Sequence, residues 1–327
     1  MKKILVVGGA GYIGSITVHQ LKKNGFEPII FDNLENGHED AIKGFSLYRG
    51  DLRNYDNIDK AIEYIKPDSI IHFAGYLSVG ESVENPLKYF HNNVLGSINL
   101  LKSIKKYNIN KIIFSSTCAT YGQPEILPVN EQEKMHPESP YGESKLMVEK
   151  IIQSLSGSIN SISLRYFNVA GALPNGSIGE DKQPYATIIP LAIKSIIDKT
   201  RFTLNGKNYD THDGTCIRDY IHVVDLADAH IAALKKLETY KGFDVFNVGV
   251  GKGYSNLEII KMIETVSAKK VNVIEGPNRP GDPVEIFSDN SKIKSKLNWM
   301  PRYNLKNIIE SAWAWHSNNP KGYNDKN

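Results

Sequence analysis

The apolar run Ile4–Val7 passes directly into Gly8-Gly9-Ala10-Gly11-Tyr12-Ile13-Gly14, which opens a helical pattern from about Tyr12 to Asn24. A buried strand, a tight glycine turn and a helix in this order bring the backbone close to a pyrophosphate. They also present free N–H groups at the helix N-terminus. The spacing is G-x-x-G-x-x-G rather than the commoner G-x-G-x-x-G, but the physical demand on the backbone is the same. The turn therefore predicts a dinucleotide-binding site.

An acidic residue ends the next predicted strand. Asp32 follows Pro28–Phe31, at the position where a carboxylate can accept hydrogen bonds from a ribose diol. A carboxylate there repels a 2′-phosphate, so it favours NAD over NADP. Asp51-Leu52, after the third strand, is predicted to lie near the adenine ring, although an ordinary strand-end carboxylate explains the spacing almost equally well. The fourth strand ends at Phe73-Ala74-Gly75, whose small residues leave room for a cofactor across the sheet edge.

Apolar runs alternate with helical stretches through the first half of the chain. Strands without polar alternation, separated by helices, indicate a parallel sheet covered on both faces. With right-handed crossovers this gives a doubly wound α/β (Rossmann) fold. The predicted strands are Ile4–Val7, Pro28–Phe31, Phe45–Tyr48, Ser69–Phe73, Lys111–Ser115 and Ser161–Phe167, and the helices after the first span about 54–66, 86–107 and 140–155.

The pattern loosens in the second half. We predict a loop over 168–184, a helix over 188–199, a polar hairpin over 201–215, a helix over 225–237 and a strand over 244–247. The last two elements are assigned back to the sheet. The predicted domains are therefore a Rossmann domain, residues 1–175 and 219–250, and a smaller discontinuous lobe, residues 176–218 and 251–327. A ligand is expected in the cleft between them.

The composition limits the class of protein. The 327 residues predict about two domains, and 41% apolar with 23% charged residues excludes a disordered, collagenous or coiled-coil chain. A net charge of +3 without a basic block gives no reason to expect nucleic acid. Neither a signal peptide nor a membrane span is expected, because the first apolar run is cut short by glycines and no run approaches the ~20 residues of a span.

Two further residue types bear on location and metal binding. Cys118 and Cys216 are too few for a disulfide framework and suit a reducing compartment, so we expect a cytoplasmic protein. No metal site is expected, because His212 and His222 match no metal-ligand spacing.

A tyrosine and a lysine form the candidate catalytic pair. Tyr141 and Lys145 lie early in a helix introduced by prolines, and their i, i+4 spacing places both on one helix face. A nearby ammonium and a cationic nicotinamide ring would lower the pKa of the phenol, which is near ~10 when free. Ser115-Ser116-Thr117, after the fifth strand, supplies hydroxyls at the same sheet edge. Taken alone, the tyrosine and lysine could be a surface pair. Together with the glycine turn and Asp32 they predict hydride transfer at a secondary alcohol.

These motifs resemble the extended short-chain dehydrogenase/reductases and, more closely, the UDP-glucose 4-epimerase family. The resemblance covers most of the chain. It is carried by GGAGYIGS at 8–15, FDNLENG at 31–37, HFAG at 72–75, VGESVENPLKY at 79–89, NNVLGS at 92–97, SPYGESKLMVEK at 139–150, RYFNVAGA at 165–172, DGTCIRDYIHVVDLADAH at 213–230 and RPGD at 279–282.

The resemblance implies specific roles. Tyr141 would be the base, Lys145 would hold the nicotinamide ribose and Thr117 would bind the sugar hydroxyl. The implied cofactor residues are Gly8, Gly11, Tyr12, Ile13, Gly14, Asp32, Asn33, Asn36, Gly37, Asp51, Leu52, Phe73, Ala74, Gly75, Asn92, Ser115, Tyr141, Lys145 and Phe167. The implied substrate residues are Thr117, Tyr141, Asn168, Thr187, Leu204, Arg218, Arg279 and Asp282.

The implied activity is interconversion of UDP-glucose and UDP-galactose through a transient 4-keto sugar and tightly bound NADH, by a homodimer paired through residues 86–107 and 140–155. Three positions differ from many members of the family. Leu77 replaces a lysine, Thr187 replaces Asn or His, and Ile286 is intermediate in size at the position that gates an N-acetyl group. A UDP-N-acetylglucosamine 4-epimerase or a bifunctional enzyme therefore stays open.

Two other classes are disfavoured. A 4,6-dehydratase needs an Asp-Glu pair after the Thr of the fifth strand, where this chain has Cys118-Ala119. A redox-sensing binding protein would be expected to lack the tyrosine or the lysine.

Overall fold

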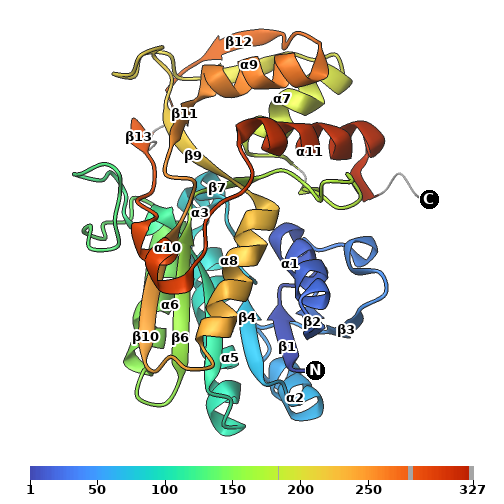
Figure 1. Ribbon diagram of the computed structural model, residues 1–327, viewed down its shortest axis with the longest axis vertical. Helices are drawn as coiled ribbons and strands as arrows, with labels where there is room; N and C mark the ends of the chain where they lie inside the picture. The colour runs from blue at the N-terminus through green and yellow to red at the C-terminus, as the bar shows by residue number, and fades with distance from the viewer. Residues whose placement is uncertain (183, 279–282, 324–327) are drawn as a thin grey trace.

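The computed structural model describes residues 1–182, 184–278 and 283–323. Its lower half in Figure 1 contains a seven-stranded sheet of order β10-β6-β5-β4-β1-β2-β3, in which all neighbours are parallel. The strand order reverses direction between β1 and β4, so the predicted doubly wound α/β fold is confirmed. The strands are β1 (Lys3–Val7), β2 (Glu27–Asp32), β3 (Ser46–Arg49), β4 (Ser69–His72), β5 (Lys111–Thr117), β6 (Asn160–Tyr166) and β10 (Phe243–Val248).

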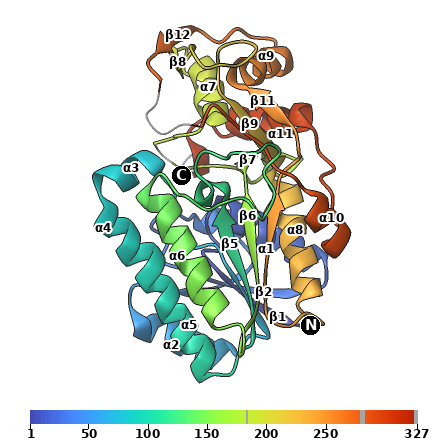
Figure 2. The same ribbon diagram turned by 90° about the vertical axis from the view of Figure 1, so that its left-hand side faces the viewer.

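Helices cover both faces of this sheet (Figure 2). Helices α2 (Tyr55–Ile65), α5 (Gly96–Lys106) and α6 (Pro140–Ser154) lie on one face, and α1 (Tyr12–Lys23) packs with α8 (Val223–Lys236) on the other. Strand β1 shows why the sequence requires two covered faces. Ile4 and Val6 are buried in the core on the α1–α8 side, whereas Leu5 and Val7 are buried on the opposite side. A continuous apolar run is therefore the expected sequence of such a strand.

The helix predicted over 86–107 is built from three segments. These are α4 (Pro86–Tyr89), a π-helical segment η2 (Phe90–Leu95) and α5. The π-helical segment bears Asn93, whose Oδ1 accepts the N–H of Tyr76 at 2.8 Å and whose Nδ2 donates to Oγ of Ser144 at 2.9 Å. Wide turns of this kind are frequent at functional sites. A short helix that the sequence analysis did not assign, α3 (Val79–Glu84), precedes them.

The second lobe lies above the sheet in Figure 1. It contains the strands β7 (Asn168–Ala170), β9 (Ile217–His222), β11 (Gly253–Ser255) and β13 (Glu285–Ile286), which form one sheet. A second sheet consists of β8 (Phe202–Asn205) and β12 (Val273–Gly276). Helices α7 (Ile188–Ile197), α9 (Asn256–Ser267) and α11 (Leu305–Asn318) pack together beside these sheets. The remaining short elements are η1 (Glu39–Ile42), η3 (Cys118–Thr120) and α10 (Ser291–Leu297).

The predicted hairpin over 201–215 is wrong. Strand β8 pairs in parallel with β12, far along the chain, instead of turning back on itself. The reason is that Phe202 and Leu204 point into the apolar core of the second lobe and need a partner strand next to α9. The polar residues that follow fold into a turn, in which Tyr209 N–H donates to the carbonyl of Gly214 at 2.9 Å.

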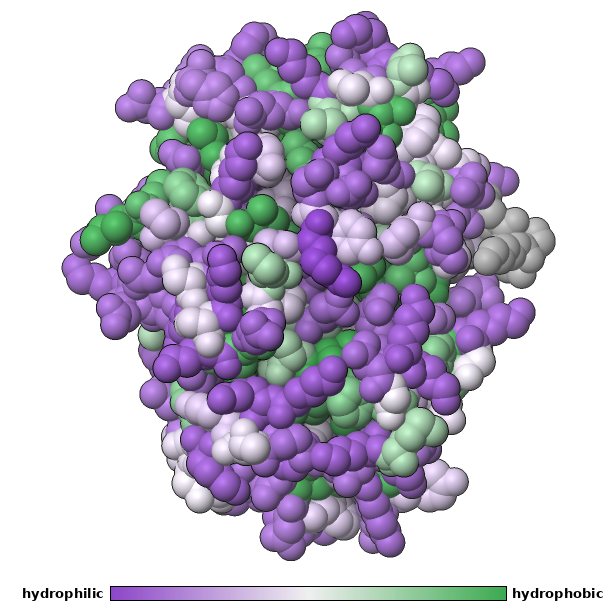
Figure 3. Space-filling view, viewed as in Figure 1, coloured by the Kyte–Doolittle hydropathy of each residue, from purple (hydrophilic) through white to green (hydrophobic). Residues whose placement is uncertain are grey.

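Helix α10 packs against α8 and β10, although the predicted boundaries assign it to the second lobe. The domain boundaries stay a prediction. On the face drawn in Figure 3, hydrophilic side chains predominate and hydrophobic ones form scattered groups. Within the described ranges no helix is long and apolar enough to cross a bilayer.

Candidate active site and cofactor pocket

An open cavity lies over the carboxyl edge of the sheet, and the empty space in it and at its mouth amounts to about 1270 Å³. One side is formed by the glycine turn and the ends of β2, β3 and β4, and the other by Gly179–Lys182 and Tyr323 of the second lobe. The structure brings together on this cavity the predicted cofactor residues Gly8, Gly11, Tyr12, Ile13, Gly14, Asp32, Asn33, Asn36, Gly37, Asp51, Leu52, Phe73, Ala74, Gly75 and Asn92.

The glycine turn has little room for side chains. Gly8 has a φ of +80°, and a Cβ there would lie 2.8 Å from Cα of Ala74. A Cβ on Gly14 would collide with the carbonyl oxygen of Gly8. Gly11 caps the N-terminus of α1, and within the described part of the chain no side chain caps this helix and no acidic residue lies in its first turn. The partial positive charge of the helix end is therefore available to an anion in the cavity.

Asp32 is fixed at the end of β2 by backbone donors. Its Oδ2 accepts the N–H of Ala10 at 2.9 Å, and its Oδ1 accepts the N–H of Leu34 at 2.8 Å. Burial raises the pKa of this carboxyl, and the hydrogen bonds from Leu34 and Ala10 oppose the rise. Each carboxylate oxygen keeps a second lone pair, so the group can also accept from a diol in the cavity.

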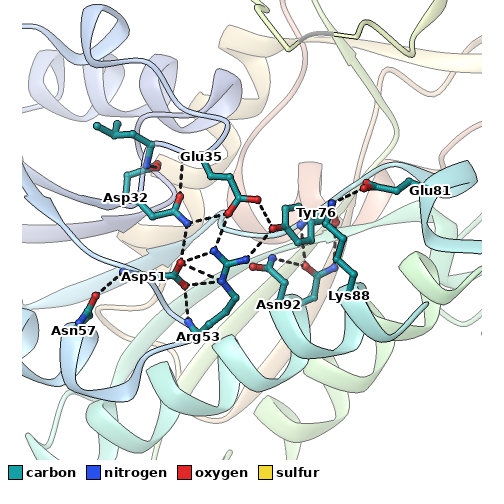
Figure 4. Close-up of polar contacts among 12 residues, drawn as sticks. Asp32, Glu35, Asp51, Arg53, Asn57, Tyr76, Glu81, Lys88 and Asn92 are labelled. Atoms are coloured by element: carbon teal, nitrogen blue, oxygen red, sulfur yellow. Dashed lines mark hydrogen bonds and ion pairs between the residues drawn. The ribbon is translucent and has the colours of Figure 1, made fainter. Parts of the chain in front are cut away.

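A network that the sequence analysis missed surrounds Asp51 (Figure 4). The guanidinium of Arg53 contacts the Asp51 carboxylate, donates to Oε2 of Glu35 at 2.8 Å and donates to the hydroxyl of Tyr76 at 3.0 Å. Asn33 Nδ2 donates to Oδ2 of Asp51 at 3.0 Å. Burial raises the pKa of Asp51, but hydrogen bonds from Arg53 and Asn33 outweigh it and lower the pKa to about 2. The carboxylate therefore stays charged and fixed at this end of the cavity.

The candidate catalytic side chains converge beside the cavity. Helix α6 begins at Pro140 after Ser139, whose Oγ accepts the N–H of Gly142 at 3.2 Å. This start places Tyr141 against Tyr76, which lines the cavity, and within hydrogen-bonding reach of Thr117 at the end of β5.

Lys145, one turn further along α6, is 4% exposed, and its Nζ donates to the carbonyl oxygen of Ser115 at 2.9 Å. The Nζ also lies close to Gly75 in the cavity wall, where a Cβ would be 3.4 Å from it. The hydroxyl of Ser115 points elsewhere, to Nε2 of His230 at 3.0 Å. In this structure Ser115 therefore contacts Lys145 through its backbone.

The predicted lowering of the Tyr141 pKa does not occur in the protein alone. Burial raises the pKa of Tyr141 well above its usual value, and the hydrogen bond with Thr117 only opposes this rise. Burial also lowers the pKa of Lys145 to about 8, against the effect of Glu149. The spacing of the two residues predicts the effect of the ammonium, whereas the desolvation of both groups arises only in the folded protein. A phenolate at this position therefore requires additional positive charge, which a cationic ring in the cavity would supply.

The predicted substrate residues lie in several places. Arg218 on β9 is in register with Ile286 on β13, and Asn168 on β7 pairs with Tyr220 of the same strand β9. Ile286 packs against Phe167, the remaining predicted cofactor residue, in a small buried cluster. The side chain of Leu204 is 2% exposed in the lobe core, so only its backbone could reach a ligand. Arg279 and Asp282 lie outside the described residues.

The predicted substrate residue Thr187 contacts a loop whose own cavity-lining groups the motifs did not indicate. The hydroxyl of Thr187 contacts the carboxyl of Glu180, whose pKa burial raises to about 7. Glu180, Lys182, Tyr323 and His38 line the cavity, and the rings of His38 and Tyr323 are in contact. Tyr323 follows the last helix, and its sequence carries no signal that could place it at this cavity. For metals, the described residues contain no cluster of three or more His, Cys, Asp or Glu suited to an ion.

The fold and the site together define an extended short-chain dehydrogenase/reductase. A family profile described as "NAD dependent epimerase/dehydratase family" matches residues 4–249. A UDP-glucose 4-epimerase of Lacticaseibacillus casei is 45% identical over 99% of this chain and 99% of its own length. The chain therefore belongs to the NAD dependent epimerase/dehydratase family.

Two solved structures extend this similarity. The UDP-glucose 4-epimerase of Bifidobacterium longum, in complex with NAD⁺ and UDP, is 37% identical with a TM-score of 0.95, covering 98% of this chain and 100% of that one. The UDP-Glc/GlcNAc 4-epimerase of Campylobacter jejuni is 41% identical with a TM-score of 0.84, covering 97% of this chain and 100% of that one.

Proposed function

We propose that the protein is an NAD-dependent 4-epimerase that interconverts UDP-glucose and UDP-galactose. The observation that carries the proposal is the convergence of Tyr141, Thr117 and Lys145 on the edge of a cavity whose glycine turn suits a dinucleotide. The relative from L. casei, which matches over nearly its whole length, is a UDP-glucose 4-epimerase. The reaction class is therefore isomerisation at C4 of the sugar.

The residues around the cavity fit NAD. The N-terminus of α1 would hold the diphosphate, Asp32 would accept from the adenosine ribose, and Lys145 would donate to the nicotinamide ribose. The uncapped helix end and the lack of room for a Cβ at Gly8 and Gly14 support this assignment. When bound, NAD⁺ would supply a reversible hydride acceptor.

The chain's own residues manage the proton and the orientation of the sugar. Tyr141 accepts the proton of the C4 hydroxyl through its phenolate and returns it at the end of the cycle. Thr117, next to it, holds that hydroxyl by a hydrogen bond, and Lys145 keeps positive charge close by. Burial of all three side chains below one-tenth exposure excludes water from the carbon that becomes a ketone.

The nucleotide end of the substrate would be held by the second lobe. Arg218 carries a planar guanidinium suited to a diphosphate, and we assign Arg279 the same role. Asn168, Thr187, Asp282 and the backbone of Leu204 would complete this binding. With the diphosphate anchored, the sugar can turn over to present its opposite face.

The first test is an assay without added cofactor. Purified protein mixed with UDP-galactose should form UDP-glucose, because its NAD stays bound. The Tyr141→Phe variant should lose at least about 10²-fold in kcat, the lower range for a general base. Tyr64→Phe, at a tyrosine on α2 that is 81% exposed, is the matched control and should retain wild-type kcat. Full activity of Tyr141→Phe would refute the assigned base.

N-acetylated sugars are the second candidate substrates. Ile286 is 5% exposed, contacts Phe167 and lies beside Arg218, and the C. jejuni relative acts on both sugar types. The Ile286→Tyr variant should reduce turnover of UDP-N-acetylgalactosamine more than that of UDP-galactose. Equal reduction of both would exclude Ile286 as the gate.

We also propose a homodimer working in the cytoplasm. Leu87 on α4, Leu95 on η2 and Met147 on α6 are exposed apolar side chains on the helices that the resemblance assigns to the dimer interface. Cys118 and Cys216, the two cysteines of the chain, are not joined in a disulfide, which supports a reducing compartment. Light scattering should give twice the chain mass of 36.6 kDa, and a mass of one chain would contradict the dimer.

A further inference from the structure

Two segments from distant parts of the chain close one side of the cofactor cavity. Gly179–Lys182, between β7 and α7, and Tyr323, after α11, both line it, and we call them the roof. Figure 1 shows the C-terminal end of α11 beside that connection and over α1. The glycine turn forms the opposite side of the cavity. A bound dinucleotide would therefore lie between the sheet and the roof.

Tyr323 holds the roof together. Its backbone N–H donates to Oδ2 of Asp181 at 2.8 Å, and its hydroxyl donates to the carbonyl of Gly179 at 3.4 Å. The side chain is only 6% exposed, because its ring contacts that of Trp315 at a centroid distance of 4.7 Å. The C-terminal segment is thus anchored to the loop that lines the cavity.

The same tyrosine joins the roof to the sheet domain. Its ring lies 4.7 Å from the ring of His38, which follows β2. The Nε2 of His38 donates to the backbone carbonyl of Asp181 at 2.8 Å. The hydroxyl of Tyr12, another residue that lines the cavity, donates to the carbonyl of Gly171, just after β7, at 2.6 Å. Contacts with both Asp181 and His38 place Tyr323 where the roof meets the sheet domain. We call this junction of Tyr323, Asp181 and His38 the seam.

The residue before Tyr323 shows how closely this seam is packed. Gly322 has a φ of +69°, and a Cβ there would collide with the carboxylate of Asp181. Only glycine provides both this backbone conformation and the required space. The Gly322-Tyr323 pair therefore docks on Asp181 in one orientation.

We propose that Tyr323 is a cofactor-retaining residue that holds the roof against the sheet until its contacts with Asp181 and His38 break. The inference rests on the proposed function, in which NAD occupies this cavity. The contacts of Tyr323 give a physical reason why bound NAD would be retained. A reaction that removes hydrogen from a sugar carbon and returns it to the same carbon fails if the reduced cofactor leaves between the two steps.

The test is the rate of cofactor exchange in the holoenzyme. Wild-type protein and the Tyr323→Ala variant are mixed with excess isotopically labelled NAD⁺, and the resident NAD is followed by mass spectrometry. Tyr323→Ala should exchange at least about tenfold faster, the factor that corresponds to 1.4 kcal/mol. Tyr323→Phe should stay within about threefold of wild type, because it keeps both ring contacts and loses only a long hydrogen bond.

A matched control separates retention from general damage. Tyr64→Ala removes a tyrosine that is 81% exposed on α2, and it should exchange at the wild-type rate. Thermal unfolding is recorded for every variant, since a purely structural role would lower the melting temperature without changing the exchange rate. If Tyr323→Ala does not fold, Gly322→Ala and His38→Ala disturb the same seam and should also exchange faster.

Two outcomes overturn the proposal in different ways. Folded seam variants that exchange at the wild-type rate would reject the role of Tyr323 and leave the proposed function intact. Wild-type protein that holds no NAD and does not convert UDP-galactose would reject both.

Discussion

A buried ion pair lies behind the candidate catalytic residues. Glu149, one turn after Lys145 on α6, and Arg165 on β6 are both 3% exposed and in contact at 2.6 Å. The guanidinium also donates from Nε to both carboxylate oxygens, at 3.0 and 3.2 Å, and from Nη1 to the hydroxyl of Tyr121 at 3.0 Å. Ser116, next to Thr117, donates to the same carboxylate. The pair therefore connects β5, β6 and α6 directly behind the site.

The perturbation is Glu149→Gln, which keeps the size of the side chain and removes its charge. The buried guanidinium of Arg165 is then left without a compensating carboxylate. Removing one partner of a buried pair destabilises a protein by about 3–5 kcal/mol. In proteins somewhat smaller than this one, each kcal/mol of lost stability lowers the melting temperature by about 2–4 °C. We therefore expect the melting temperature of Glu149→Gln to be roughly 6 °C or more below that of the wild type.

The assay is thermal unfolding at one fixed, saturating NAD concentration, because bound cofactor stabilises the folded state. The double variant Glu149→Gln/Arg165→Met removes both charges, and removing a complete buried pair is often tolerated. We expect it to melt above Glu149→Gln alone, with a coupling of about 1–3 kcal/mol. If Glu149→Gln melts at the wild-type temperature, or if the loss in the double variant equals the sum of the two single losses, the pair does not stabilise the fold in this way.

Three more predictions follow from the site and the core. Because burial lowers the pKa of Lys145 to about 8, its ammonium is present below that pH and lost above it. The kcat of the holoenzyme should therefore fall as pH rises through about 8, and a flat profile to pH 10 would contradict the role of Lys145. Gly14→Ala places a Cβ against Gly8 and 2.8 Å from Cα of Gly9, so it should be purified without NAD. Gly80→Ala, with no described heavy atom within 4 Å of its Cβ, should keep its NAD, and equal NAD content in both variants would count against the steric argument. Four histidines are held neutral by burial, which lowers their pKa to about 3 or 4, so below pH 6.5 the unfolded chain binds more protons than the folded one. Stability should be full above pH 6.5 and fall towards pH 4, by up to roughly 1.4 kcal/mol per pH unit for each histidine. Urea midpoints that do not change between pH 7 and pH 5 would contradict this prediction. These histidines are His72, His222, His230 and His316.

The sheet and the glycine turn could be predicted from the sequence because their signals are local. The run Ile4–Val7 is apolar at every position, since alternate residues enter cores on opposite faces of the sheet. The turn that follows needs glycines at fixed positions because neighbouring backbone, as at Ala74, leaves no space for a Cβ. The dinucleotide-binding fold could therefore be predicted from a short stretch of sequence.

Features that depend on contacts between distant parts of the chain could not be predicted from the sequence. Strand β8 finds its partner β12 across a long stretch of chain, so its polar continuation was mistaken for a hairpin. Tyr323 reaches the cavity only because α11 packs on the second lobe, and the guanidinium of Arg53 is fixed by Asp51 and Glu35 from separate strand ends. Tertiary packing determines each of these contacts.

The pKa of Tyr141 shows a second limit. Its spacing from Lys145 indicated the correct pair of residues, but the burial of both groups, which dominates their titration, is a property of the folded molecule. Residue type and spacing therefore identified the candidate site, whereas its electrostatics required the structure.

The central claim is that hydrogen leaves C4 of the sugar and returns to the same carbon within one closed site. The most direct measurement uses UDP-galactose carrying deuterium at C4, incubated with the purified holoenzyme in ordinary water without added NAD. We expect UDP-glucose that retains the deuterium at C4 through many turnovers. Loss of that deuterium to solvent during turnover would contradict it.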